Sequence, residues 1–148
     1  MSDYTIRAAR AEEAAVIRSM IRAERLDPTH VHWENFLVAE AADGRLVACG
    51  QIKPYRVGRE LGSLVVLTAY RRGGLGAAII NALIAREQAR GNTVLYLFCV
   101  AFREPYYGKF GFVRVGLKDL PAALKLKYAL GASVTRLARH RLIAMRRG

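Results

Sequence analysis

The chain has 148 residues, 53% of them hydrophobic, which fits one domain with a single substantial core. No apolar run reaches the roughly 20 residues of a membrane span, and the charged start MSDYTIRAAR lacks the apolar stretch of a signal peptide, so we expect a cytoplasmic protein. Twenty-four Lys and Arg against twelve Asp and Glu give a net charge of +12, which predicts attraction to anions: a phosphorylated cofactor, an acidic substrate, nucleic acid or an anionic membrane surface.

The N-terminal third of the chain predicts a strand followed by a helix. Residues 4–10 (YTIRAAR) alternate in polarity like an edge strand. Residues 11–26 have helical spacing, and this helix should end near Asp27-Pro28, because proline disfavours helical geometry in the residue before it. Four residues can share its apolar face: Ala15, Ile17, Met20 and Ile21.

Three strands are predicted next, at residues 35–41, 45–55 and 60–67. Ala42-Asp43-Gly44 lies between the first two, and its Asp-Gly pair suits a tight hairpin turn. These strands should therefore run antiparallel to one another.

The second half of the chain begins with a helix from about Leu75 to Arg90, closed by Gly91 at the usual C-terminal glycine position. TVLYLFCV (93–100) is continuously apolar, which indicates a central strand covered on both faces. The remaining elements should be a short helix at 102–110, a strand at 111–116, a helical piece at 121–130 and a last strand at 141–147. This order predicts an α/β fold: a mixed, largely antiparallel sheet flanked by helices, in a single domain over 1–148.

YRRGGLG (70–76) places three glycines at the start of a helix, where each costs roughly 1 kcal/mol relative to alanine at an interior position. A ligand would explain them. The first amide N–H groups of a helix are unpaired and the positive end of its dipole points outward, while glycine lets an anion approach the backbone. Arg71 and Arg72 add charge-assisted contacts. We predict a pyrophosphate here, with a ligand-free glycine turn as the alternative.

Other phosphate-binding motifs do not fit this turn. A Walker loop requires G-x-x-x-x-G-K-[ST], and a dinucleotide-binding fold requires G-x-G-x-x-G after the first strand. Metal chemistry is not indicated either. Cys49 and Cys99 lie in apolar stretches without a CxxC pair or a histidine cluster, so we expect buried reduced thiols, no metal and no disulfide.

Two segments match motifs of a known family. Residues 71–76 fit [Q/R]-x-x-G-x-[G/A] after a strand, and residues 107–112 (YGKFGF) fit Y-x-K-x-G-F at a typical distance downstream. With its strand order, the chain resembles the GNAT superfamily of acyl-CoA-dependent N-acetyltransferases over about residues 4–116. The basic segment 117–148 lies beyond the resemblance and should complete the same domain.

The resemblance implies acetyl-CoA as cosubstrate, without a metal. The pantetheine arm would pair with the backbone around Leu64, Val65 and Val66. The pyrophosphate would be held by amides of Arg71, Arg72, Gly73, Gly74, Leu75 and Gly76. Three positions depart from the family: Thr68 often is proline, Arg72 often is glycine, and Val100 stands where an asparagine often contacts the cofactor.

The resemblance also implies catalytic residues. Glu60, four residues before Leu64, would be the general base, with an exposed strand-end glutamate paired to Arg59 or another cation as the alternative and Ser63 as a weaker rival. Tyr107 would protonate the leaving thiolate or bind its sulfur. Tyr106 is the alternate, although it replaces an apolar residue and should pack, and a core tyrosine is the remaining alternative for Tyr107. A backbone N–H near Val66 would stabilise the oxyanion.

The acceptor pocket would lie near His30, His32 and Trp33. Lys53, Arg56 and Arg59 lie on or beside the strands that should border it, and such a cationic rim favours a small carboxylate-bearing amine, for instance an amino acid or an acidic peptide N-terminus. The family includes N-acetylglutamate synthases, so an acidic amino acid is a reasonable first substrate to test.

Several alternatives remain open. They are a non-catalytic acyl-CoA-binding module, an acetyltransferase of a protein N-terminus or ribosome-associated substrate, and a nucleic-acid-binding protein; a homodimer is not excluded. Much of the positive charge lies near the C-terminus, in Lys118, Lys125, Lys127, Arg136, Arg139, Arg141, Arg146 and Arg147. Tyr128 alone adds an aromatic ring to that segment, which gives base stacking little support.

Overall fold

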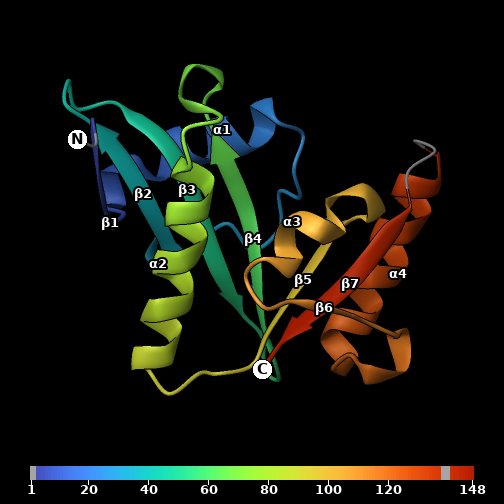
Figure 1. The fold of residues 1–148 in the computed structure, drawn as a ribbon. Coiled ribbons are helices and arrows are strands. Elements are labelled where there is room, and N and C mark those ends of the chain that lie inside the picture. The colour runs from blue at the N-terminus through green and yellow to red at the C-terminus, as the bar shows by residue number, and fades with distance from the viewer. Residues whose placement is uncertain (1–2, 138–140) are drawn as a thin grey trace. The chain divides into compact units, whose positions relative to one another are not determined.

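The computed structural model describes residues 3–137 and 141–148 (Figure 1). Its main elements are β1 Tyr4–Ala8, α1 Ala14–Ala23, β2 Phe36–Ala41, β3 Leu46–Pro54, β4 Arg59–Val66, α2 Leu75–Ala89, β5 Leu95–Val100, α3 Glu104–Gly108, β6 Val113–Val115, α4 Ala122–Leu137 and β7 Leu142–Arg147. Every helix and strand predicted from the sequence is present. The hairpin turn is confirmed too, with Gly44 at φ 87° between β2 and β3.

The strands hydrogen-bond in the order β1-β2-β3-β4-β5-β7-β6, and β4 and β5 form a parallel pair at Glu60 and Tyr96. The predicted mixed, largely antiparallel sheet with flanking helices is confirmed. The chain divides into two compact units, Met1–Lys53 with Gly62–Arg90 and Pro54–Leu61 with Gly91–Gly148. Strand β4 contributes residues to both. A single domain over 1–148 stays a prediction.

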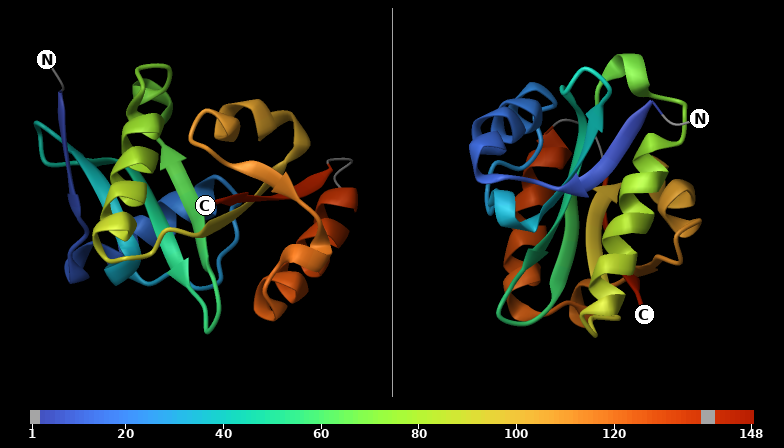
Figure 2. Two further views of the ribbon diagram at one scale, coloured as in Figure 1. Left: turned by 60° about the horizontal axis from the view of Figure 1, so that its bottom comes forward. Right: turned by 90° about the vertical axis from the view of Figure 1, so that its left-hand side faces the viewer.

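In the first unit, α1 and α2 lie on opposite faces of the strands (Figure 2). On the α1 face, Ile17, Met20 and Ile21 are buried against Val38 and Cys49, as their spacing predicts. Ala15, which was expected on this face, is exposed, because it stands about 200° around the helix from Ile17.

The other face of these strands packs against α2. A Cβ atom added to Gly50 would lie 2.9 Å from Ile79 and 3.4 Å from Leu64, so the helix approaches β3 too closely for any side chain there. Cys49 and Gly50 therefore mark the two opposite faces of β3, and successive residues alternate between these faces.

In the second unit, α4 covers one face of β5 and β7. Leu120 and Leu124 are buried against Tyr96 and Ala144. Strand β5 pairs with β7 over its whole length. Leu95, Leu97 and Cys99 on one face and Tyr96 on the other are all below one-tenth exposure. The prediction of a central strand covered on both faces is confirmed.

Candidate functional site

The glycine turn has an open backbone. Gly74 is the N-cap of α2 and adopts a left-handed conformation, with φ 82°. Arg72 is also left-handed, with φ 67°. A Cβ atom added to either Gly73 or Gly74 would meet no atom within 4 Å, so nothing in the described chain covers these residues. An anion could approach the backbone freely at this point.

Helix α2, which follows the turn, has an N-terminus that leaves the positive end of its dipole exposed. Leu75 is buried and anchors its first turn, and the first helical bond runs from the Ala78 amide to the Gly74 carbonyl. The first turn contains no acidic side chain that would offset the positive end of the dipole. These features fit the phosphate groups of a nucleotide-derived cosubstrate.

The side chain of Arg71, which was expected to contact the phosphate, also makes two contacts within the protein. Its Nε donates a hydrogen bond to the Val66 carbonyl over 2.8 Å, and its Nη2 forms an ion pair with Glu24 over 2.8 Å. The guanidinium therefore fastens the end of β4 to the residue that follows α1. Arg72 has an exposed side chain and is the better placed of the two to add positive charge for a phosphate.

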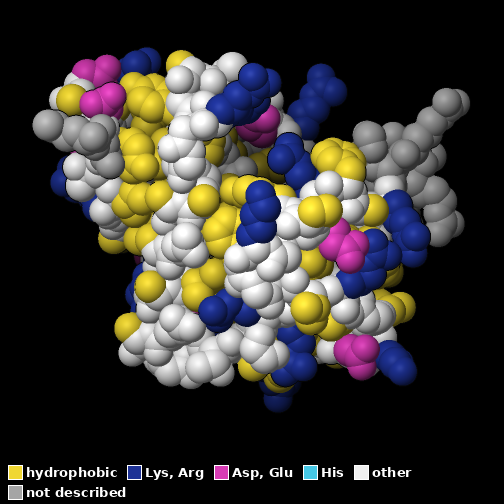
Figure 3. Space-filling model, in the orientation of Figure 1, with side chains coloured by type: hydrophobic (Ala, Val, Ile, Leu, Met, Phe, Trp, Pro, Cys, Tyr) yellow, Lys and Arg dark blue, Asp and Glu magenta, His cyan; other side chains and the backbone are white. Residues whose placement is uncertain are grey.

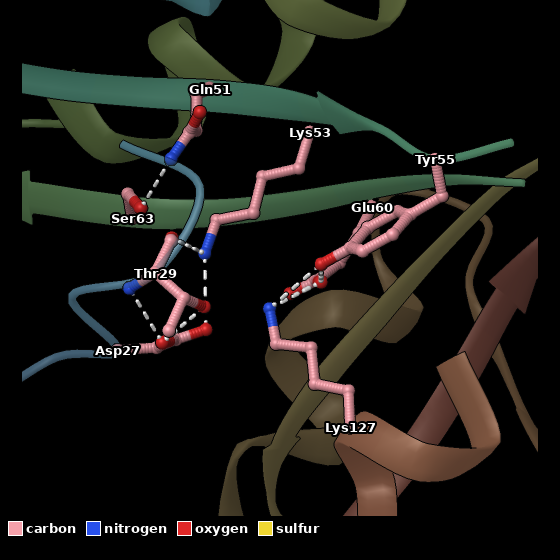
Figure 4. A network of polar contacts seen from close by, with 8 residues as sticks. All are labelled: Asp27, Thr29, Gln51, Lys53, Tyr55, Glu60, Ser63 and Lys127. Atoms are coloured by element: carbon pink, nitrogen blue, oxygen red, sulfur yellow. Dashed lines mark hydrogen bonds and ion pairs between the residues drawn. The ribbon is translucent and has the colours of Figure 1, made fainter. Parts of the chain in front are cut away.

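A second set of polar residues surrounds Glu60 (Figure 4). Its Oε1 accepts a hydrogen bond from the Tyr55 hydroxyl over 2.8 Å and an ion-paired hydrogen bond from Lys127 Nζ over 2.6 Å. Lys127 Nζ also lies 3.1 Å from the Tyr55 oxygen. The Glu60 carboxylate is 6% exposed. Among the described residues, both hydrogen bonds to this carboxylate reach Oε1, which leaves Oε2 for another proton donor.

The sequence did not point to Tyr55 or Lys127. The alternative to a catalytic role was an exposed glutamate paired with Arg59 or another cation. Glu60 does pair with a cation, Lys127 on α4, but its side chain is buried rather than exposed. Burial, and next the nearby Glu60 carboxylate, raise the pKa of Tyr55 to about 12. Tyr55 therefore remains a hydrogen-bond donor at neutral pH.

Tyr107 lies on α3, packed edge-on against Tyr106 with ring centroids 5.2 Å apart and against Phe112 at 6.5 Å. Burial raises the pKa of its phenol to about 12. In the described part of the chain no hydrogen bond to its hydroxyl is recorded. A protonated phenol without an internal partner is available to donate a proton.

The residues expected to hold the cofactor, from Leu64 to Val66 and from Arg71 to Gly76, all lie in the first unit. Glu60 and Tyr107 both lie in the second unit, but no hydrogen bond joins them. Each group stays a prediction for the function assigned to it.

The residues expected around the acceptor differ in their surroundings. Trp33 packs against the core beneath α1, whereas His30 and His32 are exposed. Lys53 was expected in a cationic rim but is only 1% exposed, with its Nζ 3.1 Å from Asp27 Oδ2 and 3.0 Å from the Thr29 carbonyl (Figure 4). Its ammonium is therefore an internal group and adds no charge to the surface.

Arg56 and Arg59 line a groove with Tyr55, Asn92, Thr93 and Pro121. Glu60 is not among the residues lining this groove, because it points to the other side of β4 from Arg59. The expected cationic rim of the acceptor pocket therefore lacks Lys53, and for Arg56 and Arg59 it stays a prediction.

The basic C-terminal segment is not uniformly a solvated surface. Lys127 is ion-paired to Glu60, and Arg147 donates to the Phe110 carbonyl over 2.8 Å. Lys118, Lys125 and Arg141 are exposed, while Arg139 and the side chain of Arg136 lie outside the described residues. On the face in Figure 3, Lys and Arg side chains stand in several separate groups.

Cys49 and Cys99 are buried free thiols, and burial raises their pKa values to about 12 and about 11. Within residues 3–137 and 141–148, no cluster of three or more His, Cys, Asp or Glu side chains could hold a metal. No helix in this part of the chain is long and apolar enough to cross a membrane.

Comparison with known proteins places the chain in a family. The model of the GNAT acetyltransferase domain matches residues 32–114, more than half of the chain. The chain therefore belongs to the GNAT acetyltransferase family, as its two motifs predicted. Among curated protein sequences no significant match is found.

Solved structures share its fold. N-acetylglutamate synthase from Neisseria gonorrhoeae, complexed with coenzyme A and N-acetyl-glutamate, has a TM-score of 0.79 at 19% identity, over 100% of this chain and 36% of that one. Rv2747 from Mycobacterium tuberculosis, in complex with CoA, has a TM-score of 0.73 at 17% identity, over 96% and 97% of the two chains. The chain thus spans about a third of the Neisseria enzyme and nearly all of the mycobacterial protein.

Proposed function

We propose that the protein transfers an acetyl group from acetyl-CoA to the primary amine of a small, carboxylate-bearing acceptor such as an amino acid. The open, left-handed turn at Gly74 is the observation that carries this proposal, because it exposes backbone amides at the positive end of α2. The pyrophosphate of acetyl-CoA would bind there. Its pantetheine arm would pair with the backbone of Leu64 to Val66.

Glu60 is proposed as the general base. Its Oε2 accepts a proton from the acceptor amine as the amine nitrogen bonds to the thioester carbon. Lys127 and Tyr55 hold Oε1, so the carboxylate has one fixed orientation. The electron pair of the carbonyl moves to its oxygen, where a backbone N–H near Val66 stabilises the charge.

Tyr107 is proposed as the general acid. When the carbon–sulfur bond breaks, the electron pair stays on sulfur, and the Tyr107 hydroxyl supplies the proton that yields the free thiol of CoA. A phenol whose pKa is raised to about 12 is fully protonated at neutral pH. It therefore starts each turnover in the form that the reaction requires.

Two observations support a carboxylate-bearing acceptor. The net charge of +12 attracts anions and disfavours the approach of polyamines. The Neisseria gonorrhoeae synthase with the same fold is complexed with N-acetyl-glutamate, an acetylated amino acid. The argument from a cationic rim no longer contributes, because Lys53 is internal and the groove that Arg59 lines does not include Glu60.

A panel of amines assayed for release of CoA thiol tests the acceptor. We expect kcat/KM to be higher for glutamate and aspartate than for a basic dipeptide or spermidine, and the difference to shrink as salt screens long-range attraction. An acidic dipeptide separates an amino acid from a peptide N-terminus. Preference for spermidine or the basic dipeptide would contradict the proposed acceptor class.

A further inference from the structure

Ser63 has a backbone conformation that a strand does not require. It lies inside β4 with φ 55°, in the left-handed region that residues other than glycine and asparagine rarely adopt. Strained positions of this kind persist where the surrounding structure holds them, and they concentrate at functional sites. The neighbouring contacts show what holds this one.

Two groups on β3 contact Ser63. Gln51 Nε2 donates a hydrogen bond to the Ser63 hydroxyl over 2.8 Å (Figure 4), and Cys49 Sγ lies 3.6 Å from the Ser63 carbonyl. Gln51 is fully buried, at 0% exposure. It therefore acts as a fixed donor from inside the protein and holds the serine oxygen in one place.

This bond determines where the serine proton can point. The hydroxyl oxygen accepts from Gln51, so its own hydrogen is directed elsewhere. Gln51 Oε1 has no partner within the described chain, so it does not receive that hydrogen. Ser63 is half-buried, which leaves its O–H group accessible from one side. The pair Gln51–Ser63 thus presents one oriented donor.

The position of Ser63 along β4 suggests the group that accepts this hydrogen bond. In the proposed function, the pyrophosphate lies at residues 71–76 and the pantetheine arm runs back along Val66 and Leu64. The thioester then falls at the next residue, which is Ser63. An acceptor bound to its hydroxyl would be a carbonyl oxygen that gains negative charge during the reaction.

We infer that the Ser63 hydroxyl donates a hydrogen bond to the thioester carbonyl oxygen of acetyl-CoA, and that Gln51 is the positioning residue that orients it. This inference rests on the proposed function. As the amine attacks, the carbonyl electron pair moves onto oxygen, and the hydrogen bond from Ser63 strengthens without transferring its proton. In this assignment the Ser63 hydroxyl takes the place of the backbone N–H near Val66 as the oxyanion donor, because three strand residues separate the two positions by roughly 10 Å.

The test separates the hydroxyl from the backbone. Ser63→Gly removes the hydroxyl but favours the left-handed conformation. Ser63→Ala removes the hydroxyl and keeps the strain. We expect kcat to fall roughly 10²-fold in both variants, with CoA affinity by calorimetry unchanged, because CoA has no carbonyl at this position.

Gln51→Met keeps the side-chain length and removes the donor together with the unpaired Oε1. It should lower kcat about tenfold in the wild-type background and have no further effect in Ser63→Ala, because Gln51 acts only through the hydroxyl. A purely structural role would instead lower kcat equally in both backgrounds, and that result would overturn the role of Gln51.

Full turnover in Ser63→Gly would overturn the inference, because the backbone conformation alone would then suffice. A higher KM for the amine with unchanged kcat would also overturn it, since the hydroxyl would then contact the acceptor. If the wild-type protein itself binds no CoA, the proposed function fails, and this inference with it. Calorimetry on the wild-type protein therefore distinguishes the two failures.

Discussion

The glycine turn and the Glu60 cluster are built in different ways. The turn is a continuous run of residues whose function depends on backbone shape: Gly74 supplies a positive φ, and nothing covers it. The cluster uses side chains from three separate segments, Tyr55, Glu60 and Lys127, held by bonds of 2.6–3.1 Å. A backbone site can be recognised from a short motif. A side-chain site requires the fold.

The two regions also tolerate substitution differently. At the turn, any side chain is a problem because it occupies the space of the ligand, whatever its chemistry. In the cluster, the chemistry of each group matters because a buried carboxylate without its partners is costly. Variants at the two regions should therefore fail in distinct steps: loss of cosubstrate binding at the turn, and loss of turnover at the cluster.

The largest effect is expected at Gly74. Gly74→Asp adds a side chain at φ 82° and a negative charge facing the pyrophosphate, so acetyl-CoA affinity should fall at least about 100-fold by calorimetry. Gly91→Asp is the matched control. Gly91 also has a positive φ, at 84°, and open surroundings, but it follows the opposite end of α2.

Both aspartates should cost roughly 1–2 kcal/mol of stability, because an L side chain is strained in the left-handed region. Only Gly74→Asp should lose acetyl-CoA. Equal affinity in the two folded variants would remove the phosphate site from the turn and, with it, the contrast between the two regions.

Tyr107→Phe should have the next largest effect. Removal of the proton donor should lower kcat by roughly 10-fold to 10⁴-fold, with a modest change in KM. Tyr106→Phe, one residue away in the same ring cluster, tests the assignment. A larger loss from Tyr106→Phe would move the acid to Tyr106, and a defect confined to acetyl-CoA binding would make Tyr107 a packing residue.

Glu60→Gln should remove the acidic limb of the pH–rate profile, since the base must be ionised to accept a proton and an amide does not titrate.

Lys127→Met should lower kcat about tenfold and the free energy of unfolding by about 3 kcal/mol. This loss of stability is near the lower end for breaking a buried ion pair, because Tyr55 still donates to Glu60. Lys125→Met, an exposed position on the same helix, is the control.

The double variant Glu60→Gln/Lys127→Met sharpens this test. It contains no buried carboxylate without a cation, so it should unfold at higher denaturant concentration than Lys127→Met alone. If the two variants are equally stable, the ion pair does not hold Glu60 in the way that the structure indicates.

The sequence predicted the secondary structure, the sheet and the glycine turn because each depends on local patterns. Alternating polarity predicted strand β1, and a continuous apolar run predicted strand β5. Gly74 was found because glycines at a helix start are unusual. By contrast, Lys127 lies 67 residues from Glu60, and nothing in its own neighbourhood distinguishes it from Lys125.

Lys53 and Ser63 are two further residues whose surroundings could not be predicted from the neighbouring sequence. A lysine on a strand is usually at the surface, and only the fold places Asp27 and Thr29 around Lys53. A serine in a strand has no sequence signal for a positive φ, and only the contacts with Gln51 and Cys49 account for its conformation. Long-range partners determine both side chains.

The smallest effect concerns alkaline stability, and it contrasts a buried side chain, Tyr107, with the backbone of the glycine turn. The phenol of Tyr107 has an ordinary pKa of 10.0 when exposed, and burial raises its pKa to about 12 in the folded protein. Between these values the unfolded chain releases a proton that the folded chain keeps. The unfolding free energy should therefore be highest below about pH 10 and fall as pH rises toward 12, with a slope of up to about 1.4 kcal/mol per pH unit for this group.

Urea unfolding of the wild type and Tyr107→Phe from pH 8 to 11.5 measures this slope. The variant should lose less stability above pH 10 than the wild type, while Gly74→Asp should keep the wild-type slope because the turn's amides do not titrate in this range. The pKa of Tyr55 is raised to a similar value, so Tyr107→Phe should still show part of the decrease in unfolding free energy with pH. Identical slopes in the wild type and Tyr107→Phe would mean that the phenol is not shielded from water, and its assignment as a buried acid would lose its physical basis.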